Sequence, residues 1–152
     1  MKKYIFTFLV LVAIIACNKE KFQTKPTLKV LSSNTKKVPL SGTLSVKLEF
    51  TDKEGDVSDS LLVIRQRINK RMPVTLKALP YKIPDFPKTT KGEINIFMDY
   101  YGDLTLQLDA IRIPGSNPSR NEPDTMNIKF VAKDKGGHYS DTASLNNIII
   151  IR

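Results

Sequence analysis

The chain of 152 residues contains one cysteine, one histidine and no tryptophan. A single cysteine cannot form an intrachain disulfide, so apolar packing must hold the domain together. With His138 as the only histidine, neither a zinc site nor a Cys–His nucleophile pair is indicated. The sequence also lacks a G-x-S-x-G motif and a phosphate-binding glycine loop. It therefore predicts a protein that is not an enzyme; a hydrolase whose acids have no recognisable pattern is the alternative.

The N-terminus has the pattern of an export signal. Lys2 and Lys3 precede an uncharged stretch, residues 4–15, and Ala16 then supplies a small side chain. The apolar run is shorter than the roughly 20 residues that cross a bilayer. We therefore expect residues 1–16 to be a cleaved signal peptide. A short buried helix at the start of the fold is the alternative interpretation.

The only cysteine lies directly after this stretch, in the tetrapeptide Ile14-Ile15-Ala16-Cys17. It resembles the lipobox of bacterial lipoproteins, with Ile14 in place of the commoner leucine. In that family the signal is cut before the cysteine, which carries diacylglycerol and an acyl chain such as palmitate. The resemblance implies that Cys17 is lipidated and that the membrane is a partner; a free reactive or metal-binding Cys17 is the alternative. Asn18, where relatives retained in the inner membrane have aspartate, implies the outer membrane and leaves the face open.

The chain is basic, with 24 Lys and Arg against 15 Asp and Glu. Loss of residues 1–16 would leave 22 basic and 15 acidic residues. An exported lipoprotein does not meet nucleic acid routinely, so we expect no nucleic-acid partner. The excess charge favours acidic lipid headgroups, phosphorylated glycolipids or an acidic glycan as the partner. An envelope protein is a further possible partner. A merely solvated basic exterior is the alternative.

After the cysteine, residues 17–25 ("CNKEKFQTK") are polar and predict a lipidated tether. Residues 26–152 are enough for one core and predict a single domain.

Apolar and polar residues alternate at several places in this domain, as in half-buried strands. The clearest segments are residues 44–50, 94–98, 104–113 and 126–132, and weaker ones are residues 28–31, 61–68, 74–79 and 148–151. No segment has a sustained apolar period of 3.6 residues. Seven or eight strands separated by turn signals predict an all-β domain, a single antiparallel β-sandwich.

Two loops that follow predicted strands are alike, "FTDKEGDVSDS" from residue 50 and "VAKDKGGHYSDT" from residue 131. They resemble the loops after the second and sixth strands of bacterial immunoglobulin-like and PKD-like domains. The resemblance implies an immunoglobulin-like β-sandwich in which both loops lie at one end.

Carboxylates at that end suggest a calcium site. Calcium binds six to eight oxygen atoms, often in glycine-containing loops. Asp52, Glu54 and Asp56 alternate in the first loop, and Asp134 would join them from the second. Calcium is thus the one candidate cofactor, and a calcium-dependent adhesion or glycan-binding module is an alternative function. Ordinary turn formation by aspartate and glycine is the competing explanation.

Aromatic side chains suggest a possible binding rim made of Tyr100, Tyr101, His138 and Tyr139. Three strand candidates lie between residues 68 and 126, although an even number is needed for the two acidic loops to share an end. If residues 74–79 are the irregular candidate, Tyr100 and Tyr101 join the acidic loops. If another candidate is irregular, they face the opposite end.

Arginines in the segment "RQRINKR" suggest a possible anion-binding face formed by Arg65, Arg67 and Arg71. A solvated strand face is the alternative. Together the patterns predict a lipid-anchored envelope protein whose β-sandwich binds or assembles without catalysis.

Overall fold

The computed structural model describes residues 25–152 and shows an all-β protein with one short helical turn. The predicted signal peptide, Cys17 and most of the predicted tether lie outside the described residues. No helix in residues 25–152 is long and apolar enough to cross a membrane.

The strands form three sheets in which all but one of the pairings are antiparallel. The strands are β1 (Thr27–Ser33), β2 (Lys37–Val38), β3 (Thr43–Thr51), β4 (Ser60–Arg67), β5 (Val74–Thr75), β6 (Leu79–Lys82), β7 (Lys91–Asp99), β8 (Ile111–Arg112), β9 (Asn121–Glu122), β10 (Asp124–Lys133) and β11 (Ala143–Ile150). The helical turn η1 (Tyr100–Leu104) follows β7 directly.

The smaller of the two main sheets has the order β1-β3-β7. Its central strand, β3, alternates as the sequence predicts, with Leu44, Val46, Leu48 and Phe50 buried. The larger sheet has the order β2-β11-β10-β4-β5, and β6 also pairs with β4. In β10 the alternate residues Met126, Ile128, Phe130 and Ala132 are buried.

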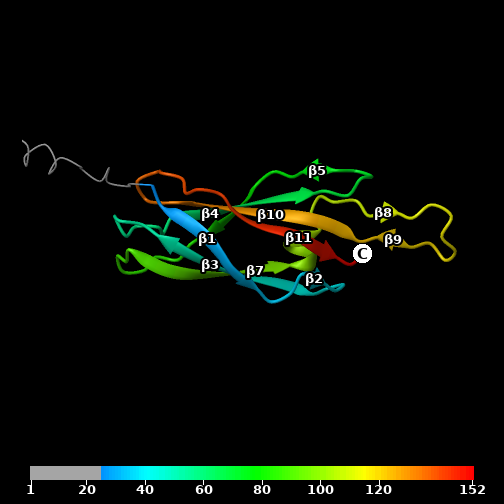
Figure 1. Ribbon diagram of the computed structural model, residues 1–152, viewed down its shortest axis with the longest axis horizontal. Coiled ribbons are helices and arrows are strands. Elements are labelled where there is room, and N and C mark those ends of the chain that lie inside the picture. Colours follow the sequence, from blue (N-terminus) through cyan, green and yellow to red (C-terminus); the bar gives the residue numbers. More distant parts are fainter. Residues whose placement is uncertain (1–24) are drawn as a thin grey trace, which may run out of the picture.

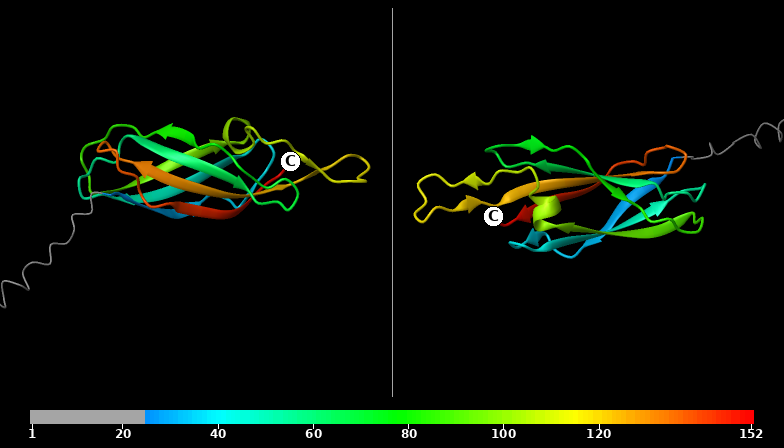
Figure 2. Two further views of the ribbon diagram at one scale, coloured as in Figure 1. Left: turned by 90° about the horizontal axis from the view of Figure 1, so that it is seen from above. Right: turned by 180° about the vertical axis from the view of Figure 1, so that it is seen from behind.

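The buried faces of these two sheets share one core. Apolar side chains from β3 and β7 and from β4, β10 and β11 belong to the same cluster of buried residues. The three views agree that the two sheets lie along the same long axis (Figures 1 and 2). Alternation in each strand therefore places one set of side chains between the sheets.

The prediction of a strand over residues 104–113 is wrong. The Asp99 carboxylate accepts hydrogen bonds from the backbone N–H groups of Tyr101 and Gly102, so the chain turns into η1 as soon as β7 ends. Only the two-residue strand β8 remains of the predicted segment, and it pairs with β9 in a separate hairpin. Residues 74–79 contribute β5 and the first residue of β6.

The strands give the molecule two distinct ends. We call one the loop end: β1 begins there, and β3 and β10 lead there into the loops of residues 52–59 and 134–142. We call the other the hairpin end: it carries η1 and the β8–β9 hairpin, which extends past the sheets (Figure 1). The start of β1 and the hairpin are thus at opposite ends of the molecule.

Candidate functional site

The two acidic loops meet at the loop end, as predicted. The backbone N–H of Lys135 donates to the carbonyl of Asp56 over 3.2 Å. The Lys133 ammonium lies 3.3 Å from the Asp59 carboxylate. The loops therefore touch through both backbone and side chains.

Two of the four predicted calcium ligands are buried and organise these loops. Asp52 is 3% exposed, and its oxygens accept the N–H groups of Glu54 over 3.4 Å and Asp56 over 3.0 Å. Asp134 is 1% exposed, accepts the N–H of His138 over 2.7 Å and lies 3.1 Å from that ring's Nδ1. Both carboxylates thus act as turn formers, as the competing explanation expected.

Asp56 is different, because its Oδ1 is buried and has no hydrogen-bond partner among the described residues. Burial raises the pKa of this carboxyl; its hydrogen bond with Asp52 and the charges of Asp134, Asp52 and Glu54 act in the same direction. Within residues 25–152 no group of three His, Cys, Asp or Glu side chains is arranged to hold a metal ion. Calcium binding stays a prediction that solution measurements must decide.

We expect Asp56→Asn to raise the melting temperature at pH 7. A carboxyl with a raised pKa in the folded state favours folding most below its unfolded pKa, and this contribution is lost as the pH rises through the folded pKa. The gain from the amide should therefore shrink toward pH 3. Thermal unfolding from pH 3 to pH 8 measures it, and no gain at pH 7 would contradict it.

Asp85→Asn is the matched control. The pKa of Asp85 is lowered by its hydrogen bond and charge interaction with Lys135, so its substitution should not stabilise the protein at pH 7. Repeating the scans in calcium and in chelator tests the metal prediction. A bound ion would stabilise the wild-type protein and lose its effect in Asp56→Asn.

The predicted rim of four aromatic residues is not formed, because the structure separates its members. His138 and Tyr139 lie at the loop end, whereas Tyr100 and Tyr101 lie in η1 at the hairpin end. Between β4 and β10 the chain runs along the sheets twice, once in β5–β6 and once in β7. This even number lets the two acidic loops share an end and leaves Tyr100 and Tyr101 at the opposite one. Tyr100 is also 3% exposed, and its hydroxyl donates to the carbonyl of Ile151 over 2.7 Å.

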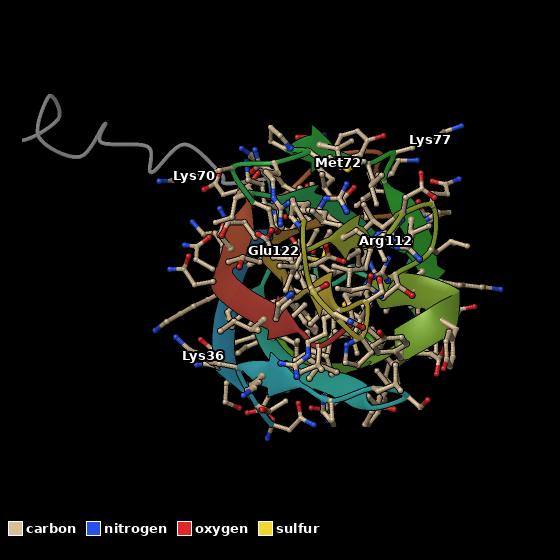
Figure 3. All side chains as sticks on the ribbon, turned by 90° about the vertical axis from the view of Figure 1, so that its right-hand side faces the viewer. Lys36, Lys70, Met72, Lys77, Arg112 and Glu122 are labelled. Carbon is tan, nitrogen blue, oxygen red and sulfur yellow. The ribbon has the colours of Figure 1, made fainter. Side chains whose placement is uncertain are left out.

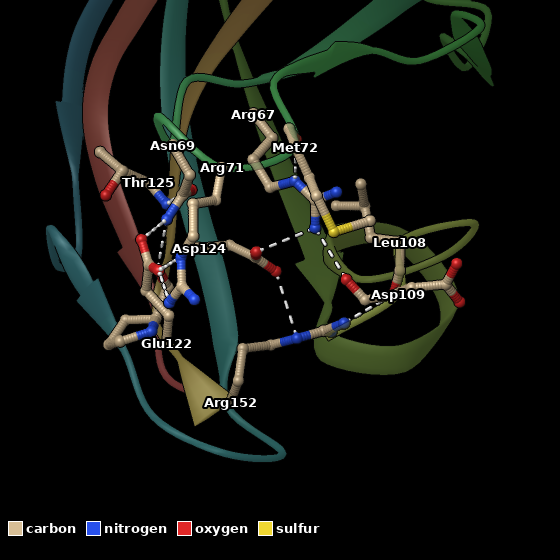
Figure 4. Close-up of polar contacts among 11 residues, drawn as sticks. Arg67, Asn69, Arg71, Met72, Leu108, Asp109, Glu122, Asp124, Thr125 and Arg152 are labelled. Atoms are coloured by element: carbon tan, nitrogen blue, oxygen red, sulfur yellow. Dashed lines mark hydrogen bonds and ion pairs between the residues drawn. The ribbon is translucent and has the colours of Figure 1, made fainter. Parts of the chain in front are cut away.

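The hairpin end contains a buried charge cluster, which we call the Arg–Asp–Arg cluster (Arg67, Asp124 and Arg152; Figure 4). Asp124 is fully buried, with its oxygens 3.2 Å from Arg67 Nη1 and 3.2 Å from Arg152 Nε. Arg67 also donates to the carbonyls of Met72 and Asp109, each over 2.8 Å. The cluster therefore fixes the turn after β4 and the loop after η1.

The predicted anion-binding face of Arg65, Arg67 and Arg71 is wrong as a solvent-facing surface. Arg65 is fully buried and donates to the carbonyls of Asp103 and Leu106. Burial lowers the pKa of Arg65. Its Nε and Nη2 have no hydrogen-bond partner among the described residues. Arg71 is exposed but bonded to Glu122 over 2.6 Å.

Strand parity explains this arrangement. Arg65 and Arg67 continue the alternation of Leu61 and Val63, whose side chains are buried in the same strand. Asp124 likewise shares the buried parity of Met126 in β10. Sequence reasoning missed Asp124 and Arg152, although the parity of Asp124 was a usable signal.

A groove lies beside the cluster at the hairpin end. Its volume is about 370 Å³, and it is lined by Arg67, Met72, Pro73, Val74, Gln107, Leu108 and Asp109. Met72 and Gln107 have φ angles of 85° and 63°, which cost energy for residues other than glycine and often mark functional sites. Lys36, Lys70, Lys77 and Arg112 also stand around this end (Figure 3). The groove itself is lined by one basic residue, Arg67, which pairs with Asp124, and by one acidic residue, Asp109. The labelled lysines and Arg112 belong to the hairpin end as a whole.

Comparisons with known proteins give little information on function. No protein-family model matches the chain, and no curated protein matches it. Solved structures of a β-glucosidase from Listeria innocua, in complex with gluconolactone and with glucose, are similar to it at 12% identity, with TM-scores of 0.42 and 0.41. These matches cover 84% of this chain but only 16% of the β-glucosidase chain. A likeness at this level carries no argument about activity.

Proposed function

We propose that the protein is a lipid-anchored envelope protein whose domain binds or assembles with a partner without catalysis. Cys17 is the lipidated residue and residues 17–25 are the tether to the outer membrane. The partner is an envelope protein or an acidic glycan, which the surplus of basic residues favours.

In this proposal the two main sheets form an immunoglobulin-like β-sandwich. Their shared core and the meeting of the 52–59 and 134–142 loops at one end support this assignment. Such a fold hosts many functions, so the role has to come from the surfaces it presents.

The observation that carries the proposal is the separation of the tether from the groove. Lys25, the first described residue, pairs with Asp141 at the loop end over 2.6 Å. The groove beside Arg67 lies at the hairpin end. A membrane anchor joined to the start of β1 therefore leaves the groove and the basic residues of the hairpin end free for a partner.

Substitution of Cys17 tests the anchor. We expect Cys17→Ser to abolish incorporation of an alkyne-labelled fatty acid and to move the protein out of the membrane fraction, because one thiol carries the attachment. Labelling and fractionation of the full chain measure both effects, and the wild-type chain is the control. Unchanged labelling or membrane association in Cys17→Ser would contradict the proposal.

A further inference from the structure

Strand β7 is a long, regular and unpaired edge of the smaller sheet. It pairs with β3 on one side through nine residue pairs without a register shift. No strand of the described chain pairs with its other side (Figure 2, right). Because successive backbone groups of a strand point to alternate sides, about half of those in β7 lack a strand partner.

The other edges have features that discourage pairing. β1 contains a register shift between Val30 and Ser32. In the larger sheet, β2 and β5 have two residues each, and the four-residue β6 contains Pro80. β11, which β2 covers only at Ile149 and Ile150, has a register shift against β10. Bulges, shortness, proline and charged side chains are the usual protections of an edge strand; β7 has none of the first three and has charges at Lys91, Glu93 and Asp99.

Apolar groups also lie along β7, between the exposed polar residues Lys91, Glu93, Asn95 and Asp99. Phe97 points away from the core and is 65% exposed. A groove of about 460 Å³ runs beside the first half of the strand, where Phe50, Phe86 and Pro87 line it. A second one, of about 180 Å³, lies between residues 94–97 of the strand and residues 81–84 of the same chain. An edge of this kind is an expected site for strand addition.

We propose that β7 pairs with β7 of a second copy of this chain, antiparallel and with Asn95 opposite its counterpart. This register sets each of the nine residues opposite a residue of the second copy, with Lys91 opposite Asp99, although the Asp99 N–H already donates to the Asp103 carboxylate over 2.7 Å. Opposite charges that face each other across an antiparallel pair stabilise it. Ile94 then faces Ile96 on the core side, and Glu93 faces Phe97 on the outer side.

Both charged residues can accept these additional partners. Lys91 lies 2.9 Å from Glu49, but its ammonium has three donors. Asp99 caps η1 through Oδ1, and a carboxylate has about four acceptor sites. The pairing joins two three-stranded sheets into one of six strands, and it does not depend on the lipid anchor at Cys17.

Cysteine trapping tests this register in the purified full chain. In an antiparallel pair, opposite Cα atoms lie about 4.5–5.5 Å apart, within the range of a disulfide. We expect Asn95→Cys to form a covalent dimer under mild oxidation. Lys29→Cys, at an equally exposed position in β1, is the matched control, and the wild-type chain reports any dimer formed through Cys17.

In the proposed dimer, Asn95 of the two copies lies on the two-fold axis. A charge placed at this position gives an independent test. Glutamate at position 95 would lie opposite Lys47 of its own chain, so Asn95→Glu should leave the fold intact. In the dimer, however, the two glutamates face each other, and we expect the dissociation constant to rise about tenfold or more. Asn95→Gln, which adds no charge, should dimerise like the wild-type protein. Sedimentation velocity over a range of concentrations measures these constants.

The outcomes are distinct. Covalent dimers in Asn95→Cys alone, together with weaker association of Asn95→Glu, would support the pairing. A wild-type chain that stays monomeric at the highest concentration reached would overturn it. A dimer that Asn95→Glu does not weaken would also overturn it, as would an Asn95→Cys chain that forms no disulfide-linked dimer under mild oxidation. Fatty-acid labelling at Cys17 does not depend on the pairing of β7. These results therefore neither support nor contradict the proposed lipid anchor.

Discussion

Asp124→Asn is expected to lower the free energy of unfolding by about 3–5 kcal/mol, because removing one partner of a buried ion cluster leaves the others uncompensated. Asp124 is fully buried between two arginines that are also largely buried. The amide keeps the shape of the side chain and removes its charge. Arg67 and Arg152 would then face each other without a counterion.

Urea denaturation of the wild-type and variant proteins measures the loss. Glu122→Gln is the control, since it breaks the partly exposed pair with Arg71 and should change the midpoint little. Adding Arg67→Met to Asp124→Asn should recover part of the lost free energy of unfolding, because it removes one of the two arginine charges that have no counterion in the single variant. A midpoint of denaturation for Asp124→Asn close to that of the wild-type protein would show that the Arg–Asp–Arg cluster does not stabilise the fold.

Phe130→Ala is expected to cost about 3–5 kcal/mol of folding free energy, the usual range for a fully buried phenylalanine. Phe130 is completely buried and lies in β10, between its cross-strand partners Val63 of β4 and Ala143 of β11. The substitution removes the ring from the core shared by the two main sheets and leaves a cavity.

The matched control is Val131→Ala, one residue further along β10. Val131 is half-buried on the opposite face of the strand, so its truncation should cost about 1 kcal/mol or less. Equal losses in the two variants, measured by urea denaturation, would contradict the assignment of the Phe130 face to the core.

Most of the long strands could be predicted from the sequence because one face of each is buried and the other is not. Residues 44–50 and 126–132 alternate without interruption, and they lie within β3 and β10. The acidic loops could be placed at one end by the same reasoning. The sequence is compatible with both turn formation and calcium binding at Asp52 and Asp134, and the structure shows that both carboxylates form turns.

Residues 104–113 show why alternation alone can mislead. A strand would place Leu104, Leu106 and Leu108 on one face, but Leu104 and Leu108 are buried and Leu106 is not. The carbonyls of this loop accept hydrogen bonds from Arg65, Arg67 and Arg152 in place of a neighbouring strand. Those donors are distant in the sequence, so no local pattern could show that the loop's backbone had other partners.

Buried arginines were missed for a related reason. Charged side chains are expected outside unless they are paired, and the partner Asp124 lies 57 residues from Arg67. The parity of β4 pointed inward for both Arg65 and Arg67, but only the paired carboxylate makes that position acceptable for Arg67.

The β8–β9 hairpin gives the experimenter a place to attach a label. Its tip is exposed around Gly115 and Asn117, beyond the two main sheets. The last two residues are poorer attachment points, because the Ile151 carbonyl accepts from Tyr100 and the Arg152 guanidinium binds Asp124. An epitope or fluorophore inserted at the hairpin tip would leave both contacts in place and would report on the hairpin end in an intact cell.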